Sequence, residues 1–234
     1  MVVEARRRVR GGLDFRASWT WSKAIDYAQN EGAVPRVNGQ FDPFELGYDK
    51  GLSSLNHPHK VVVSAVWEPA LVTPRRWLRG AANGWMVAPV YVETSGRPYS
   101  FDVFGGTRLS GGRESINGAG GAVYLPTVGR NTLRMADTMN LNLRVSRSVK
   151  VAEKVRVRGL AEIYNVMNRA NYSGVNERAF LVGTAVAGVT PLVFQDGAAV
   201  AAEGLNTRAF GAYTAAATER ARERQVQLGL RVEF

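Results

Sequence analysis

The sequence contains no cysteine, which excludes disulfide bonds, thiolate nucleophiles and cysteine-ligated metal sites. It also has no run near the roughly 18 consecutive apolar residues that a transmembrane helix needs. The first residues, MVVEARRRVRGG, lack the apolar core of a secretory signal. We therefore expect either a cytoplasmic protein or a natural polypeptide that does not start at Met1.

The lack of a long apolar run does not exclude a membrane protein, because transmembrane strands alternate apolar and polar residues. The mean hydropathy of −0.16 is compatible with such strands. The 30 lysines and arginines exceed the 20 acidic residues, which gives a net charge of +10. Nucleic acid, an acidic lipid surface and an anionic ligand are the partners such a charge suggests. Because the arginines are spread along the chain, we predict no nucleic-acid partner.

Alternation with a period of two residues runs through most of the chain and predicts β-strands. The strands are about 10 to 13 residues long, whereas soluble strands usually have about 5 to 6 and membrane-crossing strands about 9 to 11. Pro89 either weakens its strand or marks a bulge. The predicted strands are residues 2–9, 13–25, 59–70, 84–96, 138–149, 153–166 and 224–234, with 99–103 as a continuation past Pro98.

The connections between these strands alternate between short and long. The short ones lie at residues 10–12, 69–83 and 150–154, and the long ones at 26–56, 105–137 and 168–221. An antiparallel sheet with short turns at one end and long loops at the other gives this order, as in outer-membrane barrels. We therefore predict an all-β fold: an antiparallel transmembrane β-barrel segment of about seven or eight long strands, with short periplasmic turns and long extracellular loops.

Aromatic residues favour the membrane interpretation. They lie toward strand ends or on the apolar side of the alternation, where outer-membrane barrels carry girdles of aromatic rings. A large soluble sandwich with an aromatic core is the alternative, but its strands would be shorter. The residues concerned are Trp19, Trp21, Trp67, Trp85, Tyr91 and Phe234.

The polar side of the alternation predicts which residues face the lumen. Many arginines suit a wide, hydrated lumen better than the tightly filled interior of an eight-stranded barrel. We therefore expect residues 1–234 to form a single, partial barrel domain of a larger barrel, without a plug domain. The lumen-facing candidates are Arg16, Arg144, Arg156, Arg158, Glu162 and Arg231.

Few residues suggest catalysis or metal binding. His57 and His59 flank a proline, but a metal site needs three or four ligands. Four carboxylates of the first long loop do not match a calcium-binding loop; they are Asp26, Asp42, Glu45 and Asp49. We predict no catalytic residue, no cofactor, no metal and no enzyme activity. Residues 185–218 are rich in alanine and predict a short helix.

Several strings, in this order, resemble the C-terminal part of the Oar-like family of TonB-dependent outer-membrane receptors. The resemblance covers nearly the whole chain. The strings are TWSKAID from Thr20, DKGLSSLNHPH from Asp49, SGRP from Ser95, GRNTLR from Gly129, and the pattern E-x-x-N-x-x-N at Glu162, Asn165 and Asn168.

This resemblance implies a barrel of about 22 strands around a plug, in the outer membrane of a Gram-negative type of cell, with energy-coupled solute transport. It implies outer-membrane lipid, the barrel-assembly machinery, and N-terminal strands and a plug as partners. Phe234 resembles the C-terminal aromatic residue that this machinery recognises. Two alternatives stay open: a stand-alone small outer-membrane barrel with a structural or adhesive role, and a soluble basic β protein that binds a polyanion.

Overall fold

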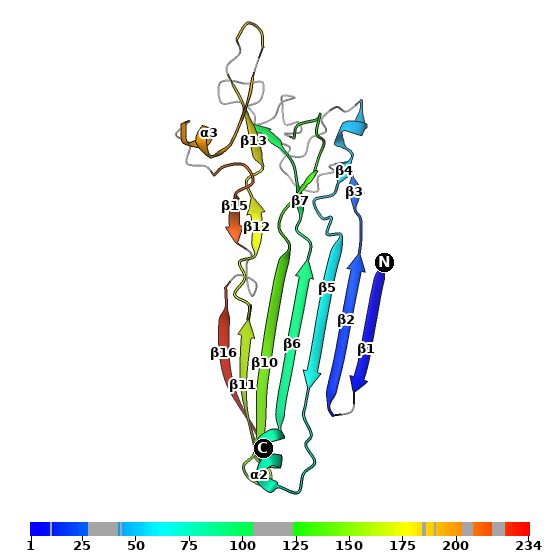
Figure 1. Ribbon diagram of the computed structural model, residues 1–234, viewed down its shortest axis with the longest axis vertical. Coiled ribbons are helices and arrows are strands. Elements are labelled where there is room, and N and C mark those ends of the chain that lie inside the picture. The colour runs from blue at the N-terminus through cyan, green and yellow to red at the C-terminus, as the bar shows by residue number, and fades with distance from the viewer. Residues whose placement is uncertain are drawn as a thin grey trace.

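The computed structural model describes residues 1–9, 11–27, 42, 44–104, 124–183, 186–189, 191–202, 208–216 and 223–234. A long antiparallel sheet carries a group of shorter strands at one end (Figure 1). The predicted all-β fold is confirmed. Neither helix in the described part of the chain is long and apolar enough to cross a membrane.

The main sheet has seven strands, and each pairs with its neighbours in chain order. Every pairing is antiparallel, so the sheet is a simple meander. Its strands are β1 (Val2–Val9), β2 (Leu13–Trp21), β5 (His59–Trp67), β6 (Trp85–Thr94), β10 (Thr138–Lys150), β11 (Arg156–Tyr164) and β16 (Gln225–Glu233). Each of the seven strands expected from the alternation is present.

Pro89 lies inside β6 and interrupts the ladder without shifting it. The pairing of β5 with β6 skips from Ser64↔Val90 to Trp67↔Val87, and the register is the same on both sides of the gap. On the other side, Pro89 pairs with Leu143 in an unbroken ladder with β10. Proline has no N–H to donate, so the interruption falls on β5 alone. The residue therefore marks a local gap and not a bulge.

The two ends of the sheet differ, as the connection lengths predict. We call the end with the connections 10–12, 68–84 and 151–155 the turn end, and the opposite end the loop end. The connection 68–84 contains α2 (Arg76–Ala82), which the sequence reasoning missed. The Trp85 indole N–H donates to Ala81 O at 2.9 Å, and Arg147 donates to Gly80 O at 2.9 Å. These bonds satisfy carbonyls at the end of α2 and hold the helix against the sheet.

At the loop end, the described parts of the long connections contain short strands, which we call the loop platform (Figure 1). They form four small sheets instead of the open loops that the sequence suggested. The predicted alanine-rich helix is confirmed as α3 (Gly197–Ala202). The other elements are β3 (Ile25–Asp26), β4 (Gly51–Leu52), β7 (Pro98–Tyr99), β8 (Asp102–Phe104), β9 (Leu133–Arg134), β12 (Tyr172–Val175), β13 (Arg178–Val182), β14 (Leu192–Phe194), β15 (Tyr213–Ala216) and the 3-10 helix η1 (Leu46–Asp49).

The buried apolar residues lie in the platform and not on the main sheet. In the described part of the chain they are Val103, Tyr124, Met135, Val175, Ala179 and Val200. On β16, by contrast, Leu228 is 76% exposed and Leu230 is 74% exposed. A soluble sheet normally covers such a face with a second layer. The sheet therefore presents an apolar face that no described part of the chain covers.

The outer strands of the main sheet, β1 and β16, run in the same direction. Val2 of β1 pairs with Thr20 near the loop end, and Val9 pairs with Leu13 at the turn end. Gln225 of β16 pairs with Tyr164 near the loop end, and Glu233 pairs with Arg156 at the turn end. In an antiparallel meander with an odd number of strands, the first and last strands always agree in direction.

Candidate functional site

The six predicted lumen-facing residues share one face of the main sheet. Residues that pair across two strands point to the same side. Arg16 pairs with Ser64, Ser64 with Val90, and the same side continues through Arg144. Arg144 pairs with Glu162, and Arg158 pairs with Arg231. Arg156 lies on this side two residues before Arg158. We call this side the polar face; that it lines a lumen stays a prediction.

Ion pairs cover much of the polar face. All of them join residues on this face, and their side chains are partly exposed. Such exposed pairs contribute little to stability, typically below about 1 kcal/mol, and they keep the face hydrated. The pairs are Glu4–Arg16 at 3.0 Å, Arg6–Asp14 and Arg8–Asp14 at 3.3 Å, Arg144–Glu162 at 3.6 Å and Arg231–Glu233 at 3.2 Å.

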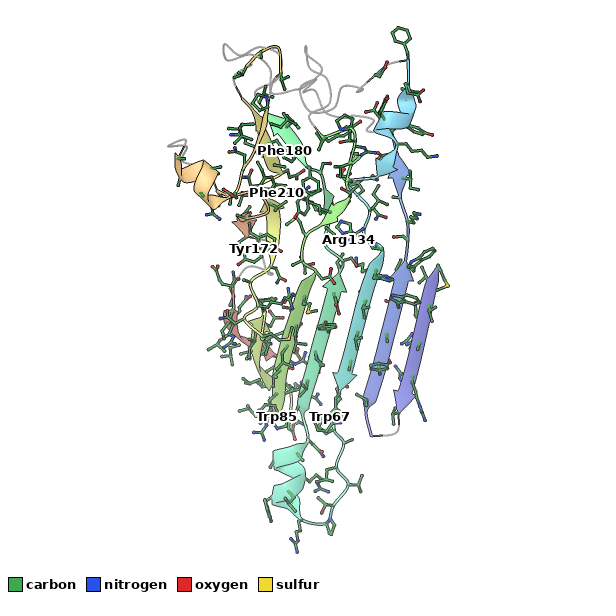
Figure 2. The ribbon with its side chains drawn as sticks, turned by 45° about the horizontal axis from the view of Figure 1, so that its top comes forward. Trp67, Trp85, Arg134, Tyr172, Phe180 and Phe210 are labelled. Carbon is green, nitrogen blue, oxygen red and sulfur yellow. The ribbon has the colours of Figure 1, made fainter. Side chains whose placement is uncertain are left out.

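The opposite, apolar face carries aromatic residues at two levels. Near the loop end, Trp19 stacks on His59 with ring centroids 5.8 Å apart. Near the turn end, Trp67 and Trp85 lie at the bottom of their strands, and Arg147 sits over the Trp85 ring at 5.0 Å (Figure 2). The levels of Trp85 and Trp21 are about ten residues apart along the strands, which is roughly 33 Å at the usual rise per residue. With a strand tilt of about 40° this spans about 25 Å, the height of the apolar band in outer-membrane barrels.

Phe234 follows β16 on the apolar side and is 95% exposed. Its place at the turn end agrees with the direction that the connection lengths assign to the last strand. No described residue contacts its ring in an aromatic pair, and its role as an assembly signal stays a prediction.

Four of the five strings that carry the family resemblance meet at the base of the platform. Arg130, from GRNTLR, has a side chain only 10% exposed and pairs with Asp26 from TWSKAID. Its Nε also donates to the backbone oxygen of Asp49 at 3.0 Å. Asn131 donates through Nδ2 to Leu52 O, and its N–H donates to the Ser100 hydroxyl at 2.9 Å. One buried hydrogen-bonded layer thus ties the first long connection to the second.

The same layer extends toward the top of the main sheet. Arg134 donates to Asn56 O at 3.2 Å and to Gly96 O at 2.6 Å, which links the strings from Asp49 and Ser95 (Figure 2). Gly96 also donates its N–H to Asp137 at 3.0 Å. A side chain on Gly96 would meet Met135 O at 2.1 Å, so this close approach requires glycine. Sequence reasoning found these strings but not their common place, because only the folded chain brings them together.

An acidic pair lies within the platform. Arg97 donates to Glu177 at 2.7 Å, and the Asp102 N–H donates to Glu177 O at 2.9 Å. Burial raises the pKa of the Asp102 carboxyl to about 7; the Glu177 carboxylate adds to the rise and Arg97 opposes it. Burial and a hydrogen bond to Asp49 raise the pKa of the Tyr124 hydroxyl. Tyr124 therefore stays a neutral donor to Asp49.

Seven aromatic side chains form two groups in the platform. Tyr172 and Tyr213 stack with centroids 4.1 Å apart, and Phe210 contacts the rings of Tyr99, Phe101 and Phe194 at 5.0 to 6.1 Å (Figure 2). Phe180 packs on Phe194 at 5.5 Å. Sequence reasoning missed both groups because their members lie far apart in the sequence, on short strands and turns without a clear alternation. These contacts join separate segments of the platform through partly exposed rings.

The candidate metal ligands have other partners. A ring nitrogen of His57 lies 2.6 Å from Ser95 O. The Asp49 carboxylate accepts from the Tyr124 hydroxyl. Asp42 and Glu45 accept backbone N–H bonds from Phe44 and Gly47. No group of three or more possible ligands occurs among the described residues.

Residues 1–121 match the family described as outer membrane beta barrel domain. The match covers β1, β2, β5 and β6 and the connections between them. Neither the curated proteins nor the solved structures contain a match to this chain.

Proposed function

The chain belongs to the outer membrane beta barrel domain family, and on this premise we propose that it forms part of the wall of a larger transport pore. Its sheet then places the apolar face against outer-membrane lipid and the polar face toward the lumen. We assign the pore to an Oar-like, TonB-dependent receptor of a Gram-negative type of cell. With this assignment we propose energy-coupled uptake as the activity. We propose a plug and the barrel-assembly machinery as partners.

The observation that carries the proposal is the shared direction of β1 and β16. A membrane barrel must pair every strand edge, because an unpaired N–H or C=O in lipid costs several kcal/mol. Bacterial barrels close with an even number of antiparallel strands. The seven strands cannot close by antiparallel pairing of β1 with β16, so closure needs an odd number of further strands.

The shape of the sheet supports a wide barrel. Diameter grows with strand number, and eight strands leave an interior that side chains fill. The seven strands lie side by side in a broad sheet, with β1 and β16 at opposite edges (Figure 1). The partly exposed ion pairs of the polar face suit a hydrated lumen. The strings from Thr20 to Asn168 support the assignment to the Oar-like family.

A gel experiment tests the proposal. Two proteins are refolded in detergent: the chain of residues 1–234 and the product of the complete in-frame gene that contains it. Each is run on a denaturing gel with and without boiling. We expect the complete gene to encode a plug and additional strands, and its product to shift on boiling as closed barrels do. We expect residues 1–234 alone to show no shift.

A heat-modifiable monomer of residues 1–234 would contradict the proposal and favour the stand-alone small barrel. Membership of the outer membrane beta barrel domain family disfavours the soluble, polyanion-binding alternative. Solubility of the chain without detergent would restore that alternative.

A further inference from the structure

The turn end of the polar face carries more positive charge than its own carboxylates balance. Lys150 lies directly opposite Arg156 on the neighbouring strand, and Arg158 lies directly opposite Arg231. Like charges directly opposite each other on two strands destabilise a sheet. The four residues Lys150, Arg156, Arg158 and Arg231 are called the basic cluster below.

The other arginines of the polar face differ from the basic cluster. Arg6, Arg8, Arg16 and Arg144 each form an ion pair with a carboxylate on a neighbouring strand. In the described part of the chain, Arg156 and Arg158 form none. Glu233 lies opposite Arg156 but pairs with Arg231 at 3.2 Å.

Arg156 and Arg158, which form no ion pair in the described part of the chain, line a hollow of about 440 Å³ at the turn end. The connection between β5 and β6 forms one wall, and β10 and β11 form the other. Besides Arg156 and Arg158, the hollow is lined by Ser146, Ser148, Asn83 and Glu68. Its volume falls in the range of small-molecule sites, about 300 to 1,000 Å³.

The walls of the hollow are held in place. Ser148 donates its N–H to Gly84 O at 2.8 Å. Gly84 has a φ of +83°, and a side chain there would meet Ser148 O at 2.5 Å, so glycine is required for this close approach. Asn83 is bonded to both backbone groups of Leu71, at 2.7 and 3.2 Å. The hollow is therefore fixed by the backbone around it.

We propose that this hollow binds the oxyanion group of a small solute, such as a phosphate or pyrophosphate. The planar guanidinium groups of Arg156 and Arg158 can donate pairs of hydrogen bonds to two oxygens of such a group. The Ser146 and Ser148 hydroxyls supply further donors. Lys150 and Arg231 add positive charge, whereas Glu68, which also lines the hollow, opposes an anion but is outnumbered by the arginines. A bound oxyanion would relieve the repulsion between the paired cations.

The site goes beyond the proposed pore function, and binding does not require a closed barrel. If the polar face lines a pore, the site lies at the turn end of the path and would hold an anionic solute there. Failure to bind an anion would overturn the site alone, whereas a heat-modifiable monomer would overturn the larger pore alone.

Calorimetric titration of the complete protein in detergent micelles tests the proposal, with pyrophosphate and inorganic phosphate as probes. The concentration of a chloride salt is adjusted to keep the ionic strength constant, because salt screens exposed charges and would itself change the affinity. We expect saturable binding of pyrophosphate. Arg156→Gln and Arg158→Gln should each weaken it about tenfold or more, since each removes charge-assisted hydrogen bonds. Arg158→Lys keeps the positive charge but loses the planar guanidinium with its paired donors, so it should have an intermediate effect.

Arg8→Gln is the matched control, because Arg8 lies on the same face but pairs with Asp14. It should leave pyrophosphate affinity within about twofold of the unchanged chain. Far-ultraviolet circular dichroism checks that each variant keeps its strands. The proposal is overturned by absence of saturable binding, or by equal losses in Arg8→Gln and Arg158→Gln. Tighter, arginine-dependent binding of a polyglutamate peptide would overturn it in favour of an acidic polypeptide partner.

Discussion

At the residue scale, the buried polar side chains of the platform join distant parts of the chain. Arg130 contacts Asp26 and Asp49, and Asn131 contacts Ser100 and Leu52. A buried polar group costs free energy unless it has a hydrogen-bond partner. Each of these residues therefore depends on a partner from another connection, which makes the layer sensitive to a single substitution.

Asp102 should make the platform sensitive to pH. Its folded pKa is about 7, above the 3.8 of an exposed aspartate. The folded state therefore holds this proton between pH 3.8 and about 7, where the unfolded state has released it. Stability falls as pH rises through this window and is level above it. We expect the platform of the unchanged chain to be cleaved several-fold faster by protease at pH 8 than at pH 5.5.

The variant Asp102→Asn keeps the shape of the side chain but removes the proton. It should match the unchanged chain at pH 5.5 and resist cleavage better at pH 8. Protease activity at each pH is normalised with an unfolded substrate. An equal pH dependence in Asp102→Asn would show that another group titrates in the platform.

Sequence alone predicts the side of a residue but not its partner. Alternation places Arg144 and Glu162 on one face, because the period of a strand is two. It does not give the register, and a different register would join other residues. The register places Glu162 beside Arg144, where the two form an ion pair, and it places no carboxylate opposite Arg158. The register becomes visible only in the folded sheet.

At the element scale, the turn between β1 and β2 depends on a close backbone approach. Gly11 and Gly12 both have positive φ values, +97° and +83°. A side chain on Gly12 would meet Glu68 O at 1.9 Å, whereas one on Gly11 would have open space around it. Glu68 also donates its N–H to Gly12 O at 2.8 Å. The hairpin is thus locked to the start of the next connection through Gly12.

The two glycines provide a matched pair of substitutions. Gly11→Ala should cost about 1 to 2 kcal/mol, the strain of a positive φ with a side chain. Gly12→Ala should cost clearly more, because the new methyl group must also push Glu68 away. Urea unfolding of the complete protein refolded in liposomes, followed by tryptophan fluorescence, measures both. Equal losses for the two variants would show that Gly12 and Glu68 are not in close contact.

Long elements were predictable from the sequence, whereas among the short ones only α3 was, from its alanine-rich composition. Each of the seven main strands follows from its own alternation over eight or more residues. The platform strands have two to five residues and are set by contacts between connections, such as those of Arg130 and Phe210. Helix α2 has seven residues and is held by Trp85 and Arg147 from other elements. Local sequence carries little information about elements of this kind.

At the scale of the whole molecule, the chain divides into two parts with opposite packing. Among the described residues, the buried apolar side chains lie in the platform, while the main sheet leaves its apolar face uncovered. A bilayer can cover that face because the strands satisfy their backbone hydrogen bonds within the sheet. The two edges are the exception, and they are the reason why we propose that further strands complete the barrel.

The division of the sheet into a lipid face and a hydrated face can be tested with single cysteines, because residues 1–234 contain none of their own. The unsubstituted complete protein in the same membranes measures the background labelling. Val63 and Ser64 are neighbours in the centre of β5; Val63 pairs with Ala17 and Tyr91, and Ser64 with Arg16 and Val90. In outer membranes that contain the complete protein, we expect a water-soluble maleimide to label Ser64→Cys at least about tenfold faster than Val63→Cys, because a thiol in hydrocarbon neither ionises nor meets the reagent. Both variants should react equally once the membrane is dissolved and the protein unfolded. Equal labelling in intact membranes would mean that both faces meet water, and faster labelling of Val63→Cys would reverse the assignment of the two faces.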